Sequence, residues 1–202
     1  MTIELFPALG VALGFAVGLV VHEFVTHLVA ANMHDPSPRF QKRLTLDLRQ
    51  HADMLGTYVA PALFIVVTLL GSVPEFYFAY GKPHAIQGAY QRGPMARVVL
   101  TAMSGPLAML AIAAVCFQLT GASDIGLLFT FAGITLVSMV AIEILPMPGR
   151  DGGRVLARLL SPQVALKYEE LRQYEALFII GVYLLFPGAV RNLSSGLADL
   201  VS

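Results

Sequence analysis

Long apolar runs separated by short polar connections constrain this chain more than any other feature of its sequence. The first run covers residues 5–31 and is long enough to cross about 30 Å of hydrocarbon as a helix. Further runs cover residues 56–78, 96–119, 125–145 and 174–186, before a weakly amphipathic tail to residue 202. Hydrophobic residues make up 56% of the chain and charged residues 13%, well below the roughly one quarter of globular proteins. The sequence therefore predicts an all-α integral membrane protein with about five to six membrane segments.

The length of 202 residues fits one compact domain, and we assign residues 1–202 to a single membrane domain. The net charge of zero gives no argument for nucleic-acid binding. Cys116 is the only cysteine and lies in an apolar run, so we interpret it as a small core residue. The lipid bilayer is accordingly the first partner that the composition indicates.

His22, Glu23 and His27 lie inside the first apolar run, in the sequence His-Glu-Phe-Val-Thr-His. An H-E-x-x-H sequence places two zinc-binding imidazoles four residues apart on one helix face, with the Glu positioned to activate water. Positions i and i+4 lie about 40° apart around a helix, whereas positions i and i+5 lie about 140° apart. His27 is thus one residue beyond the position of a second ligand, and Thr26 occupies that position.

The basic residues predict a topology, because they follow the first, second and fourth apolar runs. They are Arg39, Lys42, Arg43, Arg49, Lys82, Arg92, Arg97, Arg150, Arg154, Arg158, Lys167 and Arg172. The positive-inside rule makes all three clusters cytoplasmic. Residues 56–78 must then enter and leave on the same side or form a hairpin, which their proline and glycine residues permit. His22 would lie about 25 Å along its helix, in the cytoplasmic half of the membrane and at the depth of Asp151.

Residues 43–49 alternate polar and apolar side chains with a period of two. This alternation predicts a short β element at the cytoplasmic membrane surface. Its edge, at Leu44, Thr45 and Leu46, would bind an extended substrate peptide by strand addition. A strand that only seals the domain is the equal alternative.

Short motifs follow one another in order across nearly the whole chain. They are His22-Glu23, Ala30, Asp35-Pro36-Ser37-Pro38-Arg39, Arg43-Leu44-Thr45-Leu46, His51-Ala52-Asp53, Gly56-Thr57, Gly81-Lys82-Pro83, Ser104-Gly105-Pro106 and Leu145-Pro146-Met147-Pro148-Gly149-Arg150-Asp151-Gly152-Gly153. The ordered set resembles the site-2 protease family of intramembrane zinc metalloproteases, in its compact prokaryotic form without a PDZ domain. Ser104-Gly105-Pro106 resembles the family's Gly-Pro-x-x-Asn helix, and the last motif resembles its Asn-x-x-Pro…Asp-Gly segment.

The resemblance implies that His22 and Asp151 match the family's first and third zinc ligands and that Glu23 matches its general base. Three positions depart from the family pattern: Thr26 at the second histidine ligand, Met109 at the Asn of Gly-Pro-x-x-Asn, and Glu143 at the Asn of Asn-x-x-Pro. A catalytic zinc needs three protein ligands and an open position for water. Only two ligands remain in register.

Two rearrangements would supply a third zinc ligand. A π-bulge after His22 would add a residue to the turn and bring the imidazole of His27 closer. Alternatively, Glu143 would complete a set with His22 and Asp151, since an ionisable residue inside a membrane helix is a functional candidate by default. The sequence leaves both routes open.

The remaining histidines and the aromatic and glycine clusters have simpler interpretations. His34 and His84 are expected in solvated loops, and His51 is expected to have a local structural role. Three aromatic residues are expected to anchor the chain at a membrane interface: Tyr77, Phe78 and Tyr80. Three glycines spaced four apart favour close helix packing within the fold over packing against another protein: Gly10, Gly14 and Gly18.

Two functions from different classes fit these observations. The first is a catalytically degenerate, site-2-protease-like protein that serves as a structural or binding subunit of an assembly with other membrane proteins. The second is an active intramembrane zinc metalloprotease with Glu23 as general base, whose ligands are His22, Asp151 and either His27 or Glu143. A transporter ranks third, because few intramembrane charges line a path. We expect a multi-pass protein of a prokaryotic cytoplasmic (inner) membrane.

Overall fold

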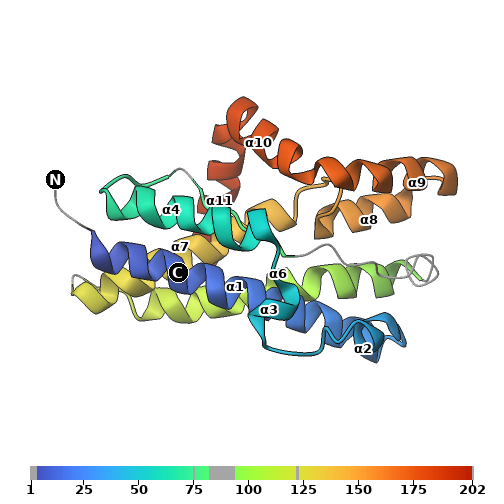
Figure 1. Ribbon diagram of the computed structural model, residues 1–202, viewed down its shortest axis with the longest axis horizontal. Coiled ribbons are helices and arrows are strands. Elements are labelled where there is room, and N and C mark those ends of the chain that lie inside the picture. Colours follow the sequence, from blue (N-terminus) through green and yellow to red (C-terminus); the bar gives the residue numbers. More distant parts are fainter. Residues whose placement is uncertain (1–3, 75, 82–93, 122, 202) are drawn as a thin grey trace.

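The computed structural model describes residues 4–74, 76–81, 94–121 and 123–201, and these parts of the chain contain helices and no strands. Figure 1 shows the helices in their order along the chain. They are α1 (Leu5–Asn32), α2 (Ser37–Phe40), α3 (Leu48–His51), the π-helix η1 (Met54–Val59), α4 (Ala60–Leu69), α6 (Met95–Gln118), α7 (Asp124–Glu143), α8 (Asp151–Leu159), α9 (Pro162–Glu170), the 3₁₀-helix η2 (Leu171–Tyr174), α10 (Glu175–Leu185) and α11 (Pro187–Val201). The predicted positions of Lys82, His84 and Arg92 fall outside the described residues.

Three of these helices, α1, α6 and α7, are long and apolar enough to cross a membrane. They pack side by side as the central bundle in Figure 1. The described residues do not support the predicted five to six spans. The apolar helix Met54–Leu69 is shorter than a full span, and the eleven residues of α10 rise only about 16 Å at 1.5 Å per residue.

The glycines of α1 allow its close approach to α7. A Cβ added at Gly10 would collide with the main chain at Leu128, and one at Gly14 would collide with Thr135. Gly18 likewise lies against Met139. These contacts confirm the expectation that this glycine face packs within the fold.

The apolar core lies between α1, α4, α6 and α7, and aromatic rings fill its centre. The ring centroid of Phe64 in α4 lies 5.9 Å from that of Phe15 and 5.6 Å from that of Tyr77. Tyr77 is fully buried, so the expectation that it anchors at a membrane interface is wrong. The helix of this segment ends at Leu69, and Gly71 follows with a φ of +84°, a conformation that favours glycine and turns the chain back over the bundle.

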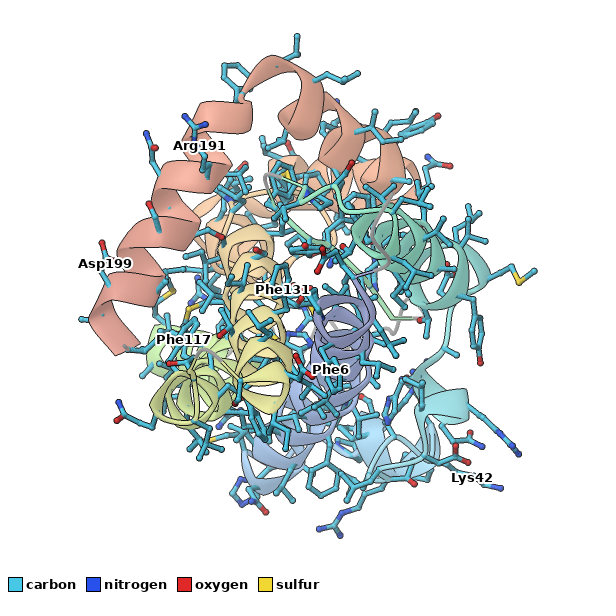
Figure 2. All side chains as sticks on the ribbon, turned by 90° about the vertical axis from the view of Figure 1, so that its left-hand side faces the viewer. Phe6, Lys42, Phe117, Phe131, Arg191 and Asp199 are labelled. Atoms are coloured by element: carbon cyan, nitrogen blue, oxygen red, sulfur yellow. The ribbon has the colours of Figure 1, made fainter. Side chains whose placement is uncertain are left out.

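The short helices α2, α3, α8 and α9 gather around the end of the bundle at which α1 finishes (Figure 1). Figure 2 looks from the opposite end, where Phe6, Phe117 and Phe131 lie on the three bundle helices. On the outer side, Arg191 and Asp199 project away from the bundle along α11 (Figure 2). The buried polar residues of α1, from His22 to His27, lie in the half of this helix that leads to the short helices.

Residues 43–49 do not form the predicted β element. The Thr45 hydroxyl accepts a hydrogen bond from the Asp47 amide, and the Asp47 carboxylate accepts one from the Arg49 amide. These local side-chain bonds begin α3 at Leu48. They satisfy backbone N–H groups that an unpaired strand would leave without partners. The period-two pattern was too short to override this helix cap.

Candidate functional site: two buried groups joined by Glu23

Four polar residues of α1 face the protein interior near its C-terminal end. His22 and Glu23 are each 6% exposed, and Thr26 and His27 are each 1% exposed. The helix is α-helical throughout Leu5–Asn32, so the π-bulge considered from the sequence does not occur. Without a bulge, His22 and His27 point into different groups of side chains.

The first group consists of His22, Glu143 and Asp151, whose ligand atoms lie within 4.8 Å of one another. His22 donates a hydrogen bond from Nε2 to Oδ2 of Asp151 over 2.6 Å, and the same nitrogen lies 4.0 Å from Oε2 of Glu143. Glu143 is the last residue of α7 and Asp151 the first of α8. Gly149, with a φ of +88°, allows the tight return between the two helices.

Two arginines neutralise the carboxylates of the first group. Arg150 is buried and donates from Nη1 to Oε1 of Glu143 over 2.5 Å, while its other terminal nitrogen contacts Glu175. Arg154 donates from Nη1 to Oδ1 of Asp151 over 2.8 Å. Charge-assisted bonds of this kind satisfy buried carboxylates that would otherwise be very costly to bury.

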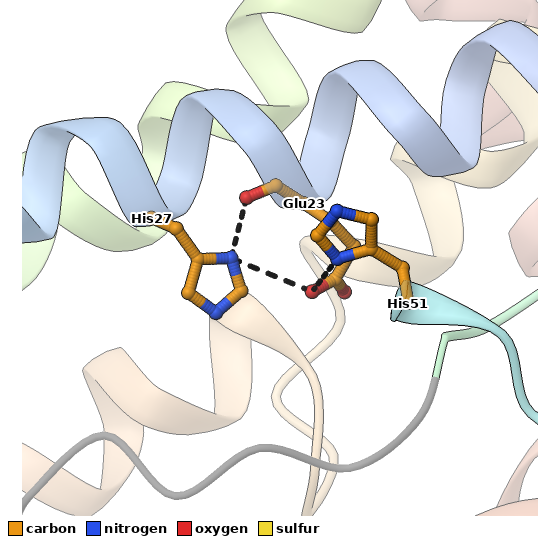
Figure 3. A group of neighbouring side chains, drawn as sticks. All are labelled: Glu23, His27 and His51. Carbon is orange, nitrogen blue, oxygen red and sulfur yellow. Dashed lines mark hydrogen bonds and ion pairs between the residues drawn. The ribbon is translucent and has the colours of Figure 1, made fainter. Parts of the chain in front are cut away.

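The second group consists of Glu23, His27 and His51, and Figure 3 shows how they face one another. His27 donates from Nδ1 to the main-chain oxygen of Glu23 over 2.5 Å, and this nitrogen lies 3.6 Å from Oε2 of Glu23. Nδ1 of His51 lies 3.9 Å from the same Oε2. The other oxygen of Glu23 lies 3.6 Å from Nδ1 of His22, so Glu23 connects the two groups.

Thr26 occupies the helix position that the second imidazole of an H-E-x-x-H pair would take. Its hydroxyl is buried and has no hydrogen-bond partner within the described part of the chain. Gly105 of α6 lies directly against it, because a Cβ at that position would collide with both Thr26 and His22. The glycine thus brings α6 onto the two α1 residues where the chemistry is expected.

The segment predicted to bind a substrate peptide is irregular, with neither helix nor strand at Leu44, Thr45 and Leu46. The Thr45 carbonyl accepts a hydrogen bond from Nε2 of His51 over 2.9 Å. Leu46 is 63% exposed. The segment therefore offers no strand edge, and its main chain positions His51.

The site contains four residues whose contribution the sequence interpretation missed: His51, Arg150, Arg154 and Glu175. The three-residue spacing between Asp151 and Arg154 at the start of a helix was a usable signal for an ion pair. The contact between Arg150 and Glu175 had no local signal, since it joins the turn before α8 to the start of α10.

Two sets of side chains offer ligands for a metal ion. The first has one imidazole and two carboxylates, and the second has two imidazoles and one carboxylate. Imidazole and carboxylate are both zinc ligands, usually three per catalytic site. A polar cavity lined by His22, Glu23, Glu143 and Arg150 adjoins the first set.

One comparison with known proteins supports a metalloprotease-like membrane protein. The chain is 26% identical over 205 residues to the Bacillus subtilis (strain 168) protein named "Putative zinc metalloprotease YwhC", and the match covers 92% of this chain and 87% of that protein. No family model matches the chain, and no solved structure matches it.

Proposed function

We propose that the protein is a non-proteolytic member of the site-2 protease family, embedded in a bacterial cytoplasmic membrane as a structural or binding subunit of a membrane assembly. It would cross the membrane several times, with the His22 end of the bundle on the cytoplasmic side. The likeness to a bacterial protein named as a zinc metalloprotease supports the family, and the three long apolar helices support the membrane location.

The observation that carries the proposal is the separation of His27 from His22. The imidazole that an H-E-x-x-H pair would supply faces Glu23 and His51 instead, and a threonine hydroxyl replaces it beside His22. A hydroxyl is a poor ligand for zinc compared with imidazole. The arginines that bind Glu143 and Asp151 supply positive charge at the carboxylates without a metal.

An active zinc metalloprotease is the second candidate, and the approach of Glu143 to His22 and Asp151 favours it. These three residues would hold zinc, which polarises a peptide carbonyl when bound. Glu23, with one oxygen 3.6 Å from His22, would accept the proton of the attacking water. This candidate requires Glu143 to exchange its contact with Arg150 for the metal.

A comparison of three strains of the native host tests the two candidates: wild type, a deletion strain, and a strain with Asp151→Asn on the chromosome. The non-proteolytic proposal predicts that deletion lowers the abundance of partner membrane proteins, whereas Asp151→Asn leaves them unchanged. Quantitative proteomics of membrane and soluble fractions measures both effects. Soluble fragments of membrane proteins that disappear equally in both altered strains, at a normal level of the Asp151→Asn protein, would overturn the proposal.

A further inference from the structure

We propose that Glu23, His27 and His51 form a second metal site, which binds a divalent transition-metal ion of the zinc class and ties α3 to α1. All three side chains are buried, and their ligand atoms lie within 4.8 Å of one another. Two imidazoles and one carboxylate are a donor set suited to zinc. Figure 3 shows these three side chains, none of which belongs to the group of His22, Glu143 and Asp151. Glu23 lies between the two groups, with its other oxygen 3.6 Å from Nδ1 of His22.

The ring of His51 is already oriented for a metal. Its Nε2 lies 2.9 Å from the Thr45 carbonyl, which only accepts, so the ring hydrogen is on Nε2. Nδ1 therefore directs a lone pair towards Oε2 of Glu23, 3.9 Å away. A metal ion between this lone pair and the carboxylate would satisfy both buried groups. A backbone carbonyl on the remote nitrogen is also the usual support of a metal-bound histidine.

The separations in the group are close to those of a metal site. Ligands bound at 2.0–2.1 Å around tetrahedral zinc stand about 3.3 Å apart. Oε2 of Glu23 lies 3.6 Å from Nδ1 of His27 and 3.9 Å from Nδ1 of His51. Closing these two gaps needs shifts of a few tenths of an ångström, and the ligand atoms of His27 and His51 lie within 4.8 Å of each other. His27 would also move its ring hydrogen from Nδ1 to Nε2 and exchange its contact with the Glu23 main-chain oxygen for the metal.

The surrounding chain encloses the group. Asp47 caps α3, whose last residue is His51, and the cap helps to fix the position of this histidine. Gly81 passes over the opposite side, where an added Cβ would lie 2.9 Å from the His51 main-chain oxygen and 3.2 Å from Oε1 of Glu23. A metal here would occupy Glu23 and fasten residues 45–51 to the bundle, which is a structural role.

X-ray absorption spectroscopy of the full chain, purified in mild detergent and loaded with one equivalent of zinc, tests this proposal without any substitution. The expected spectrum shows two imidazoles per zinc. One imidazole per zinc would place the metal at the His22 group and overturn the proposal, as would failure to retain zinc through desalting. Failure to retain zinc would leave the non-proteolytic function standing, so the two proposals can fail separately.

Matched variants identify the ligands. His51→Gln and His27→Gln should each weaken zinc binding by more than about 100-fold, because even the loss of an outer-shell partner costs about 10–100-fold. Asp151→Asn should retain one zinc per chain, measured by competition with a chromophoric chelator. Zinc lost from Asp151→Asn and kept in His51→Gln would refute the second site.

Discussion

The Nε2 atom of His22 lies 2.6 Å from Oδ2 of Asp151, although 129 positions separate the two residues in sequence. Asp151 is 1% exposed and also holds Arg154. This buried contact joins the start of α8 to the bundle helix α1.

Replacing Asp151 should therefore lower the folding stability, and the loss should be greater the more of its hydrogen bonds the new residue removes. Asp151→Ala leaves His22 and Arg154 without this buried partner and should reduce stability by about 3–5 kcal/mol. Asp151→Asn keeps a hydrogen-bonding group of the same shape and should cost clearly less. Thermal unfolding in mild detergent measures the order, and equal midpoints for the two variants would show that the contact contributes little.

Gly105 should tolerate no side chain, because α6 touches α1 there. Gly105→Ala places a Cβ against Thr26 and His22, and the overpacking should cost about 1–3 kcal/mol. Gly181→Ala in α10 is the control, since an added Cβ there meets nothing within 4 Å. The control should be neutral or stabilising by about 0.5–1 kcal/mol, as expected for glycine in a helix. A Gly105→Ala protein as stable as the wild type would contradict this packing.

Arg150 should stabilise the protein because its positive charge lies between the carboxylates of Glu143 and Glu175 and neutralises both. Arg150→Met leaves Glu143 and Glu175 buried without this cation and should cost about 3–5 kcal/mol. Adding Glu143→Gln and Glu175→Gln removes both charges and should recover part of that loss. Unfolding midpoints of the single and triple variants measure this recovery. A triple variant less stable than Arg150→Met would show that the unpaired carboxylates are not the cause of the loss.

The long apolar runs predicted the helices of the bundle, and their topology predicted that His22 and Asp151 lie at one depth. Glu143 was only one of two candidates for a third ligand beside them. The sequence did not predict the position of His51 beside Glu23, since that depends on a Thr45 carbonyl and on a cap at Asp47 rather than on any spacing from α1. The strand predicted at residues 43–49 was wrong for the same reason. Local side-chain bonds decided that segment, and a short alternating pattern does not report them.

The burial of Tyr77 also escaped prediction. An aromatic cluster after an apolar run is typical of a membrane interface. Here the helix ends at Leu69, and the returning chain carries Tyr77 into the core against Phe64. The turn depends on tertiary packing that composition does not specify.

Moving the second histidine back into register should create an H-E-x-x-H metal site beside His22. The double variant Thr26→His with His27→Ala places two imidazoles four apart on one helix face, next to Asp151. It should bind one zinc per chain in an Asp151-dependent manner, at a packing cost of about 1–3 kcal/mol against Gly105. Metal content with and without Asp151→Asn measures this. A folded double variant without zinc would mean that more than the register was lost.

Whether the protein is proteolytic is measured by a cleavage assay on the purified wild-type chain in liposomes that contain a mixture of bacterial membrane proteins, with zinc supplied. We expect no cleavage that a zinc chelator abolishes, because His27 faces Glu23 and His51 instead of completing the ligands around His22. Chelator-sensitive cleavage that Asp151→Asn also abolishes would instead identify the protein as an active metalloprotease.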